Sequence, residues 1–190
     1  MANLSISDSL YIGKGQDREC YQHPICRNQC IKVTVSKNYR QHFHDIKNYR
    51  LLKKRGIDWT YLSRFYNQCE TNLGVGLVFE LIKDYNGTVS KTLDHRLRFK
   101  HLKINSPSLN KALSILKKYL LEQGITTRDL KESNILVQYS SKTEYRLVIV
   151  DGLGHNELIP VFKLSKTLTK MKIERGWKRF LQNLQKKFSS

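Results

Sequence analysis

Three side chains near the middle of the sequence have the types that phosphoryl transfer requires. Asp129 is followed five residues later by Asn134, and Asp151 comes directly after the apolar run 148–150. A carboxylate can meet the hydroxyl group that is to be phosphorylated, while an amide oxygen and a second carboxylate are hard oxygen ligands that suit Mg²⁺. The sequence therefore predicts a phosphoryl-transfer site with Asp129 as general base and with Asn134 and Asp151 as magnesium ligands.

Two short apolar segments, 135–137 and 147–150, are expected to bring these residues together. Read as the two strands of a hairpin, they return the chain to the edge from which it started. The alternative interpretation is that Asp129 and Asn134 are ordinary turn residues and that Asp151 begins a loop after a buried strand. The order of the other motifs along the chain favours the first interpretation.

The stretch 124–154 resembles the catalytic centre of a protein kinase. It contains Arg128-Asp129-Leu130-Lys131, and the resemblance implies that Lys131 steadies the transferred phosphoryl group. The stretch also departs from the kinase pattern. Thr127 stands where kinases have a histidine, Gly152-Leu153-Gly154 replaces Phe-Gly after Asp151, and no Ala-Pro-Glu follows.

A glycine turn suited to phosphate binding lies near the start of the chain. Residues 10–20 predict a short strand that ends at Gly13 and Gly15 and leads into a second strand. Two glycines at this spacing let the backbone approach phosphates and offer them amide hydrogens. Arg18 replaces the third glycine of the kinase pattern, and its guanidinium group can itself meet a phosphate.

Lys32 stands in the otherwise apolar segment 30–33, which we predict to be a strand. In the kinase pattern a lysine at this point reaches the α and β phosphates of ATP. Alternation along a strand puts Cys30 on the same face as Lys32, where its small thiol would cover the adenine ring. The alternative is that Lys32 extends its ammonium group to solvent from an edge strand.

Residues 37–55 have apolar side chains at helical spacing, and the pattern stops at Gly56. In protein kinases the regulatory helix lies at this point of the sequence. It supplies a glutamate that orients the phosphate-binding lysine, the counterpart of Lys32. The acidic residue of this segment is Asp45. Asp45 either pairs with Lys32 or faces solvent among Lys47 and other basic neighbours.

Residues 64–70 and 74–82 predict two further strands, the second of them buried because it is apolar on both faces. In a kinase the end of this strand, here around Glu80 and Ile82, offers backbone groups to adenine. The polar segment that follows, 83–90, contains a turn pair and predicts a linker.

The second half of the chain contains the two clearest helical patterns. Residues 106–124 predict a helix with Ser106 as its N-cap and Gly124 as its stop. Residues 164–188 predict a basic amphipathic stretch that is interrupted at Gly176. Its apolar residues at helical spacing are Leu164, Leu168, Met171, Trp177, Leu181, Leu184 and Phe188. This stretch either packs under the site with its basic face outward or contacts an anionic partner such as nucleic acid or a membrane surface.

The chain has 190 residues, 39% of them hydrophobic, which suits one domain with a core or two small lobes that share one site. Its 34 Lys and Arg residues against 16 Asp and Glu residues give a formal charge of +18, which attracts polyanions. No apolar run approaches the roughly 20 residues of a membrane helix, so we expect a cytoplasmic protein without a transmembrane segment. The four cysteines lack the CxxC spacing of a zinc site, and we expect reduced thiols.

Over nearly its full length the chain is similar to the PhoP regulatory network protein YrbL family of small bacterial kinase-like proteins. The segments that carry the resemblance are IGKGQDRECY near the start, CIKV around Lys32, the TRDLKESNIL block, an Asp-x-x-Gly at 151–154 and the ending ERGWKRF. The resemblance implies a compact kinase-like fold in the bacterial cytoplasm. It links the chain to a magnesium-sensing regulatory network by name and supplies no substrate.

These observations together predict an α+β, two-lobed, protein-kinase-like fold that forms a single domain over residues 1–190. Residues 1–82 would form a small β-rich lobe with one helix, and residues 91–190 a truncated helical lobe. The predicted function is an ATP-dependent phosphotransferase that uses Mg²⁺ and acts on a protein or small-molecule hydroxyl. Two other interpretations stay open: a nucleotide-binding regulatory module that has lost turnover, and a basic RNA- or ribosome-binding protein.

Overall fold

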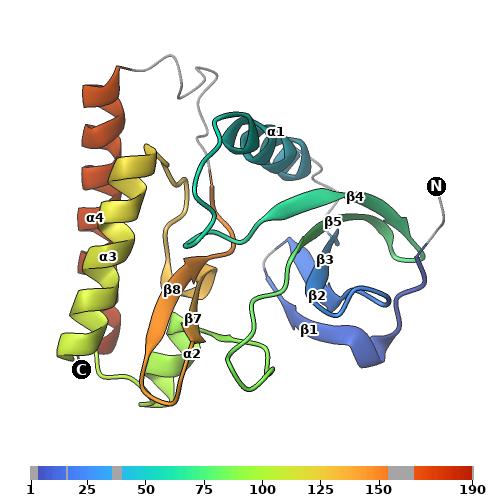
Figure 1. Cartoon of the computed structure of the whole chain (residues 1–190), viewed down its shortest axis with the longest axis horizontal. Helices are drawn as coiled ribbons and strands as arrows, with labels where there is room; N and C mark the ends of the chain where they lie inside the picture. Colours follow the sequence, from blue (N-terminus) through green and yellow to red (C-terminus); the bar gives the residue numbers. More distant parts are fainter. Residues whose placement is uncertain (1–3, 16, 36–39, 154–164, 190) are drawn as a thin grey trace. The chain divides into compact units, whose positions relative to one another are not determined.

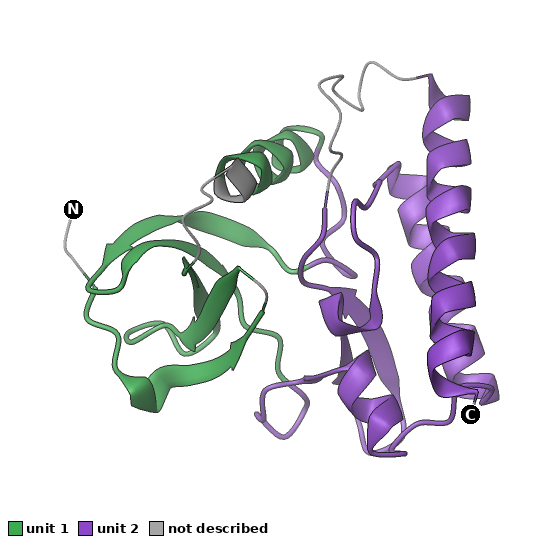
Figure 2. Ribbon diagram, turned by 180° about the vertical axis from the view of Figure 1, so that it is seen from behind, with its two compact units in different colours: residues 1–55, 63–83 green, residues 56–62, 84–190 purple. Residues whose placement is uncertain are grey.

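The computed structural model of the chain describes residues 4–15, 17–35, 40–153 and 165–189. It has a mixed α+β fold, with two antiparallel sheets and four α-helices in the part that it describes. The chain divides into two compact units, coloured separately in Figure 2. Unit 1 consists of residues 1–55 and 63–83, and unit 2 of residues 56–62 and 84–190.

Unit 1 is built on a five-stranded antiparallel sheet with the order β1-β2-β3-β5-β4. Its strands are β1 (Tyr11–Lys14), β2 (Arg18–Gln22), β3 (Gln29–Thr34), β4 (Phe65–Thr71) and β5 (Gly74–Glu80). On one face Ile31 and Val33 of β3 pack with Tyr21 and Val78 in a buried apolar cluster. The strands that the sequence predicted for this half are confirmed.

Helix α1 (Arg40–Lys54) covers the other face of this sheet (Figure 1). The ring centroid of Tyr49 lies 5.7 Å from that of Phe65 and 5.1 Å from that of Phe79. The predicted helix is confirmed from Arg40 onward, and residues 37–39 of the predicted range lie outside the described residues. Phe43, which helical spacing placed on the apolar side, is exposed.

Unit 2 contains a three-stranded antiparallel sheet in the order β6-β7-β8. The strands are β6 (Lys91–Thr92), β7 (Ile135–Tyr139) and β8 (Tyr145–Ile149). Strands β7 and β8 form the predicted hairpin, with Ile135 opposite Ile149. The sequence did not predict β6 or the short helix α2 (Leu93–Arg98), which Thr92 caps by accepting a hydrogen bond from the amide of His95.

Helices α3 (Pro107–Gln123) and α4 (Lys166–Phe188) lie side by side in unit 2 (Figure 1). The Ser106 hydroxyl accepts from the amide of Leu109, and Gly124 ends α3 at a φ of 56°, a conformation that glycine adopts readily. The predicted caps of α3 are therefore confirmed. No helix in the described ranges is long and apolar enough to cross a membrane.

Helix α4 runs through Gly176 without a break, although the sequence predicted an interruption there. Its buried side chains are Ile173, Trp177, Phe180 and Leu184. Leu168 and Met171, which were predicted to join this stripe, are exposed, and Leu164 lies outside the described residues. The buried face of α4 thus begins at Ile173, later than the apolar pattern indicated.

Two segments that have no strand or α-helix of their own are bound into unit 2 by polar contacts. In the segment 84–90, the buried Asp84 carboxylate accepts hydrogen bonds from the hydroxyl of Ser90 (2.5 Å) and the amide of Tyr139 (3.0 Å). In the segment 56–62, the carbonyl oxygen of Asp58 accepts a hydrogen bond from Tyr119 of α3 (2.5 Å). The contact of Tyr119 with Asp58 ties residues 56–62 to α3, in keeping with their place in unit 2.

Candidate functional site

The loop before β7 is tied to the residues that follow β8 by backbone hydrogen bonds. The amides of Arg128 and Asp129 both donate to the carbonyl oxygen of Gly152, over 2.8 Å and 3.3 Å. Thr127, which stands where kinases have a histidine, forms an antiparallel bridge with Leu153. The loop that carries Asp129 therefore lies directly against the segment that carries Asp151.

Asn134 joins the same cluster through both its side chain and its backbone. Its Nδ2 group donates to the carbonyl oxygen of Asp129 (3.0 Å), and its own carbonyl oxygen accepts from the amide of Val150 (3.0 Å). The Oδ1 atom of Asp151 accepts from the amide of Gly152 (2.7 Å). Asp129, Asn134 and Asp151, which the sequence singled out, are thus neighbours within unit 2.

Gly152 is a part of this cluster that the sequence analysis did not assign. It has a φ of 80°, and a side chain at this position would collide with the carbonyl oxygen of Asp129. Glycine tolerates both the conformation and the close approach, whereas an L side chain does not. The glycine that directly follows Asp151 was visible in the sequence, but its contact with Asp129 was not.

Lys131 forms an ion pair with the proposed general base. Its Nζ atom lies 2.7 Å from Oδ2 of Asp129, and the two side chains are 41% and 48% exposed. Exposed ion pairs of this kind are worth about 0–1 kcal/mol, so the lysine can exchange to another anion at little cost. The Asp129 carboxylate is accessible to a substrate from solvent.

The donor set around Asn134 suits a magnesium ion that is also bound by phosphates. The hydrogen bond from Nδ2 turns the Oδ1 atom of Asn134 away from the Asp129 carbonyl, and Asp151 adds a carboxylate. Within the described ranges no three His, Cys, Asp or Glu side chains gather as a metal cluster. Mg²⁺ commonly takes one or two protein oxygen ligands and completes its shell with water and substrate phosphates, so the residues present fit this ion.

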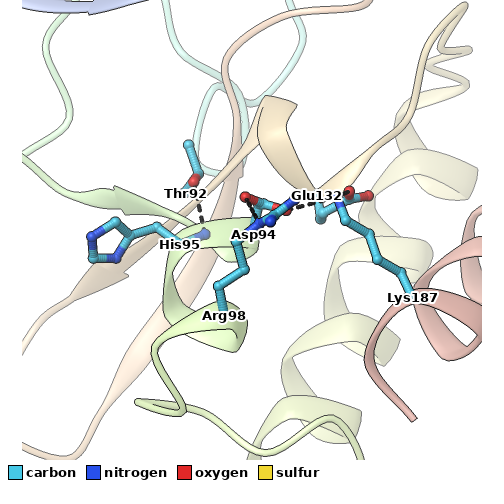
Figure 3. Close-up of polar contacts among 6 residues, drawn as sticks. All are labelled: Thr92, Asp94, His95, Arg98, Glu132 and Lys187. Atoms are coloured by element: carbon cyan, nitrogen blue, oxygen red, sulfur yellow. Dashed lines mark hydrogen bonds and ion pairs between the residues drawn. The ribbon is translucent and has the colours of Figure 1, made fainter. Parts of the chain in front are cut away.

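A polar cluster, in which Glu132 is buried and Lys187 is exposed, supports the loop from the side of α2 and α4 (Figure 3). The Nζ atom of Lys187 lies 2.5 Å from Oε1 of Glu132 and 2.8 Å from Oδ1 of Asp94, and Arg98 also donates to Asp94 (2.8 Å). Glu132 is 9% exposed. Sequence reasoning missed this cluster because its members come from three separate segments with no common spacing.

The cluster shifts the pKa of two of its groups. The hydrogen bonds to Asp94 and then to Glu132 raise the pKa of Lys187 above its ordinary value. Burial alone would raise the pKa of Asp94, but the hydrogen bonds from Lys187 and Arg98 outweigh it and the net shift is downward. Both groups are therefore held in their charged forms, which fixes the end of α4 beside the loop.

In unit 1 the predicted glycine turn connects β1 and β2. Gly13 pairs with Cys20 across the two strands, and the amide of Gly15 donates to the carbonyl oxygen of Arg18 (2.8 Å). A side chain at Gly13 would meet no atom within 4 Å, so the space over this strand is open. The contact of these glycines with phosphates stays a prediction.

Lys32 lies on β3 on the same face as Cys30, as strand alternation predicted. Its Nζ atom is 4.7 Å from the ring centroid of Phe79, and Cys30 on the same face is buried with Sγ 3.9 Å from the carbonyl oxygen of Glu80. β3 pairs with β2 and β5 on either side, so Lys32 is not on an edge strand. A hydrogen bond with Cys20 and then burial raise the pKa of the Cys30 thiol.

Asp45 of α1 forms a buried salt bridge with Arg18 of β2. Asp45 is 2% exposed and Arg18 is 7% exposed. The interpretation that Asp45 faces solvent is therefore wrong, because the helix turns it onto the sheet. A contact of Asp45 with Lys32, and a contact of Arg18 with a phosphate, stay predictions.

The predicted adenine contacts lie at the end of β5. The amide of Glu80 donates to the carbonyl oxygen of Arg64 (2.9 Å), and its own carbonyl oxygen accepts from the hydroxyl of Ser63 (3.1 Å). The backbone of Glu80 is thus already hydrogen-bonded inside unit 1. Ile82 is buried two residues further along.

Comparisons with known proteins place this chain beside a set of bacterial relatives. Residues 4–185 match the family described as PhoP regulatory network protein YrbL. The chain is 33% identical over 181 residues to a protein of Escherichia coli (strain K12) described as uncharacterized protein YrbL, covering 94% of this chain and 86% of that protein. A protein of Shigella flexneri with the same description matches to the same extent.

Proposed function

The chain belongs to the PhoP regulatory network protein YrbL family, and we propose that it is an ATP-dependent phosphotransferase that acts on a hydroxyl group. The family description names no reaction, so the proposal rests on residues of this chain. The observation that carries it is the cluster in unit 2 in which Asn134 donates to the Asp129 carbonyl beside the Asp151-Gly152 turn. One accessible carboxylate and two residues of the magnesium-ligand type are then neighbours, which supports a role in phosphoryl transfer.

Asp129 acts in this proposal as the general base. Its carboxylate takes the proton of the acceptor hydroxyl while the acceptor oxygen forms a bond to the γ-phosphorus of ATP and the bond from that phosphorus to ADP breaks. Lys131 leaves its exposed ion pair with Asp129 and neutralises the charge of the transferred group. Asn134 and Asp151 hold Mg²⁺, which neutralises the phosphates when it is bound.

Unit 1 supplies the nucleotide contacts in the same proposal. Gly13, Gly15 and Lys32 bind the phosphates. Cys30 covers the adenine ring, and the backbone around Glu80 and Ile82 offers it hydrogen-bonding groups. The two units then correspond to the small lobe and a truncated large lobe of a protein-kinase-like fold. The buried Arg18–Asp45 pair has a structural role, because it fixes α1 on the sheet of unit 1.

The proposal predicts different effects for the loss of the Asp151 carboxylate and the loss of the Asp129 carboxylate. Asp151→Asn should weaken the Mg²⁺-dependent binding of ATP, because an anionic ligand of a divalent cation is lost. Asp129→Asn should leave the affinity for ATP nearly unchanged, because that carboxylate touches the acceptor. Glu144→Gln removes one charge from an exposed residue of unit 2 and serves as the control.

Calorimetric titration of the three variants with ATP and Mg²⁺ tests the assignment. Unchanged ATP binding in Asp151→Asn would remove its metal role. A wild-type protein that binds ATP in the presence of Mg²⁺ but never turns it over would identify a nucleotide-binding regulatory module instead. Binding to RNA that falls steeply with salt, with no binding of ATP, would favour a nucleic-acid partner.

A further inference from the structure

A groove in unit 2 opens next to Asp129. It has a volume of about 600 Å³ and is lined by the loop 127–132 and by one side of α4. Six of its lining residues are basic: Arg128, Lys131, Lys172, Arg175, Arg179 and Lys187. The groove therefore contains the proposed general base within a strongly positive surrounding.

Two carboxylates also line the groove, and each is bonded to one of its lysines. Asp129 pairs with Lys131 (2.7 Å) and Glu132 with Lys187 (2.5 Å). Six basic residues against these two acidic ones leave an excess of four positive charges among the lining side chains. An anionic ligand is therefore favoured there by the local field.

The two arginines of α4 have the chemistry and the spacing for a phosphate group. Arg175 and Arg179 are four residues apart, so both lie on the same side of the helix, and both are exposed. One guanidinium group can donate two parallel N–H hydrogen bonds to two oxygens of a phosphate, which an ammonium group cannot do. Two such groups on one helix face can hold the oxygens of one phosphate.

Gly176 of α4 also lines the groove. Glycine inside a helix costs roughly 0.5–1 kcal/mol relative to alanine, and a side chain at this position would meet nothing within 4 Å. Packing therefore does not require a glycine here. The missing side chain leaves more room in the groove for a ligand.

We propose that this groove binds a small acceptor molecule that carries both a phosphate group and the hydroxyl group to be phosphorylated. Arg175 and Arg179 hold the phosphate, and the hydroxyl reaches Asp129 in the same groove. A volume of about 600 Å³ is typical of a small-molecule site, which favours such a compound over a polymer. This inference rests on the function proposed above, since it names the class of substrate for that reaction.

A pair of double variants with equal loss of charge tests the groove. Arg175→Gln with Arg179→Gln removes the two arginines of the groove, and Lys170→Gln with Lys178→Gln removes two exposed cations of the same helix that do not line it. The probe is inorganic phosphate at constant ionic strength, followed by NMR of the backbone amides of the full chain, which are present in every variant. We expect saturable binding that weakens at least tenfold in the arginine variant and less than twofold in the lysine variant.

Equal weakening of phosphate binding in both double variants, or NMR shifts that never saturate with phosphate, would overturn the proposal. Either result would show general charge screening rather than a specific site. Loss of MgATP affinity in the arginine variant alone would also overturn it, because the groove would then hold the nucleotide. The phosphate titration is independent of turnover. Selective phosphate binding in a protein that shows no phosphotransfer would support the phosphate site in the groove and contradict the proposed function. Phosphotransfer without selective phosphate binding would support the proposed function and contradict the phosphate site.

Discussion

The amide of Asp129 donates a hydrogen bond to the carbonyl oxygen of Gly152 across 3.3 Å, so the proposed base is positioned by the residue that follows the proposed metal ligand. Gly152 has a φ of 80° and lies too close to the Asp129 carbonyl to carry a side chain. This contact makes the positions of Asp129 and Asp151 depend on each other. A change at Gly152 should disturb both.

Gly152→Ala should lower the free energy of unfolding by about 1–3 kcal/mol or more, since it combines an unfavourable φ with a clash against Asp129. The same change at Gly176, which has open space in α4, should raise stability by about 0.5–1 kcal/mol. Urea unfolding followed by circular dichroism measures both. Equal effects of the two alanines would show that Gly152 has no special contact.

Breaking the buried pair between Arg18 and Asp45 should cost more stability than breaking an exposed ion pair. Arg18→Ala and Asp45→Ala should each destabilise the protein by about 3–5 kcal/mol, because each leaves the other charge buried. The double variant should cost clearly less than the sum. A parallel cycle of Lys32→Ala with Asp45→Ala tests the pairing that the sequence suggested, and strict additivity there would exclude it.

The cluster around Lys187 gives the stability a defined pH dependence. Asp94 has a lowered pKa, so its contribution is present above its unfolded pKa of about 3.9 and is lost as the pH falls through the folded value. Lys187 has a raised pKa, so its contribution is full below about pH 10.4 and is lost as the pH rises through the folded value.

Asp94→Asn should therefore destabilise the protein at pH 7, and the difference from wild type should shrink below about pH 4. Urea unfolding from pH 7 to pH 3 measures this difference. Glu144→Gln, at an exposed residue, should show a small difference at every pH. A difference for Asp94→Asn that stays constant down to pH 3 would contradict the proposed role of the ion pairs.

Local patterns predicted the regular elements of this fold well. The Ser106 cap, the Gly124 stop and the apolar stripe between them located α3, because these signals act within a few residues of each other. Helix α2 was missed because its six residues span fewer than two helical turns, which is too short for an apolar repeat to be recognised. The break expected at Gly176 does not occur, because the packing of Trp177 and Phe180 outweighs the modest helix cost of one glycine.

The proximity of the candidate site residues was predictable where motif order specified it. Asp129, Asn134 and Asp151 lie together as expected, because a hairpin joins them. The partner of Asp45 could not be predicted, because Arg18 reaches it across two separate elements. The same holds for the contact of Lys187 with Glu132, since 55 residues separate them and no sequence pattern encodes such a distance.

The four cysteines should differ in reactivity according to burial. Cys26 is exposed, whereas Cys30 is buried and has a pKa raised by its hydrogen bond with Cys20 and by burial. Since the thiolate is the reactive form, iodoacetamide at pH 7.5 should modify Cys26 first and Cys30 last. Peptide mass spectrometry over time measures the order. Early modification of Cys30 in the folded protein would contradict its placement on β3.

Incubation with γ-labelled ATP and Mg²⁺ measures whether Asp129 acts as the base of a phosphoryl transfer. The wild-type protein should release or transfer labelled phosphate, and Asp129→Asn should reduce the rate roughly 10²–10⁴-fold, the usual range for a positioned general base. An Asp129→Asn variant with the wild-type rate, or a wild-type protein with no turnover of ATP, would exclude this role of Asp129.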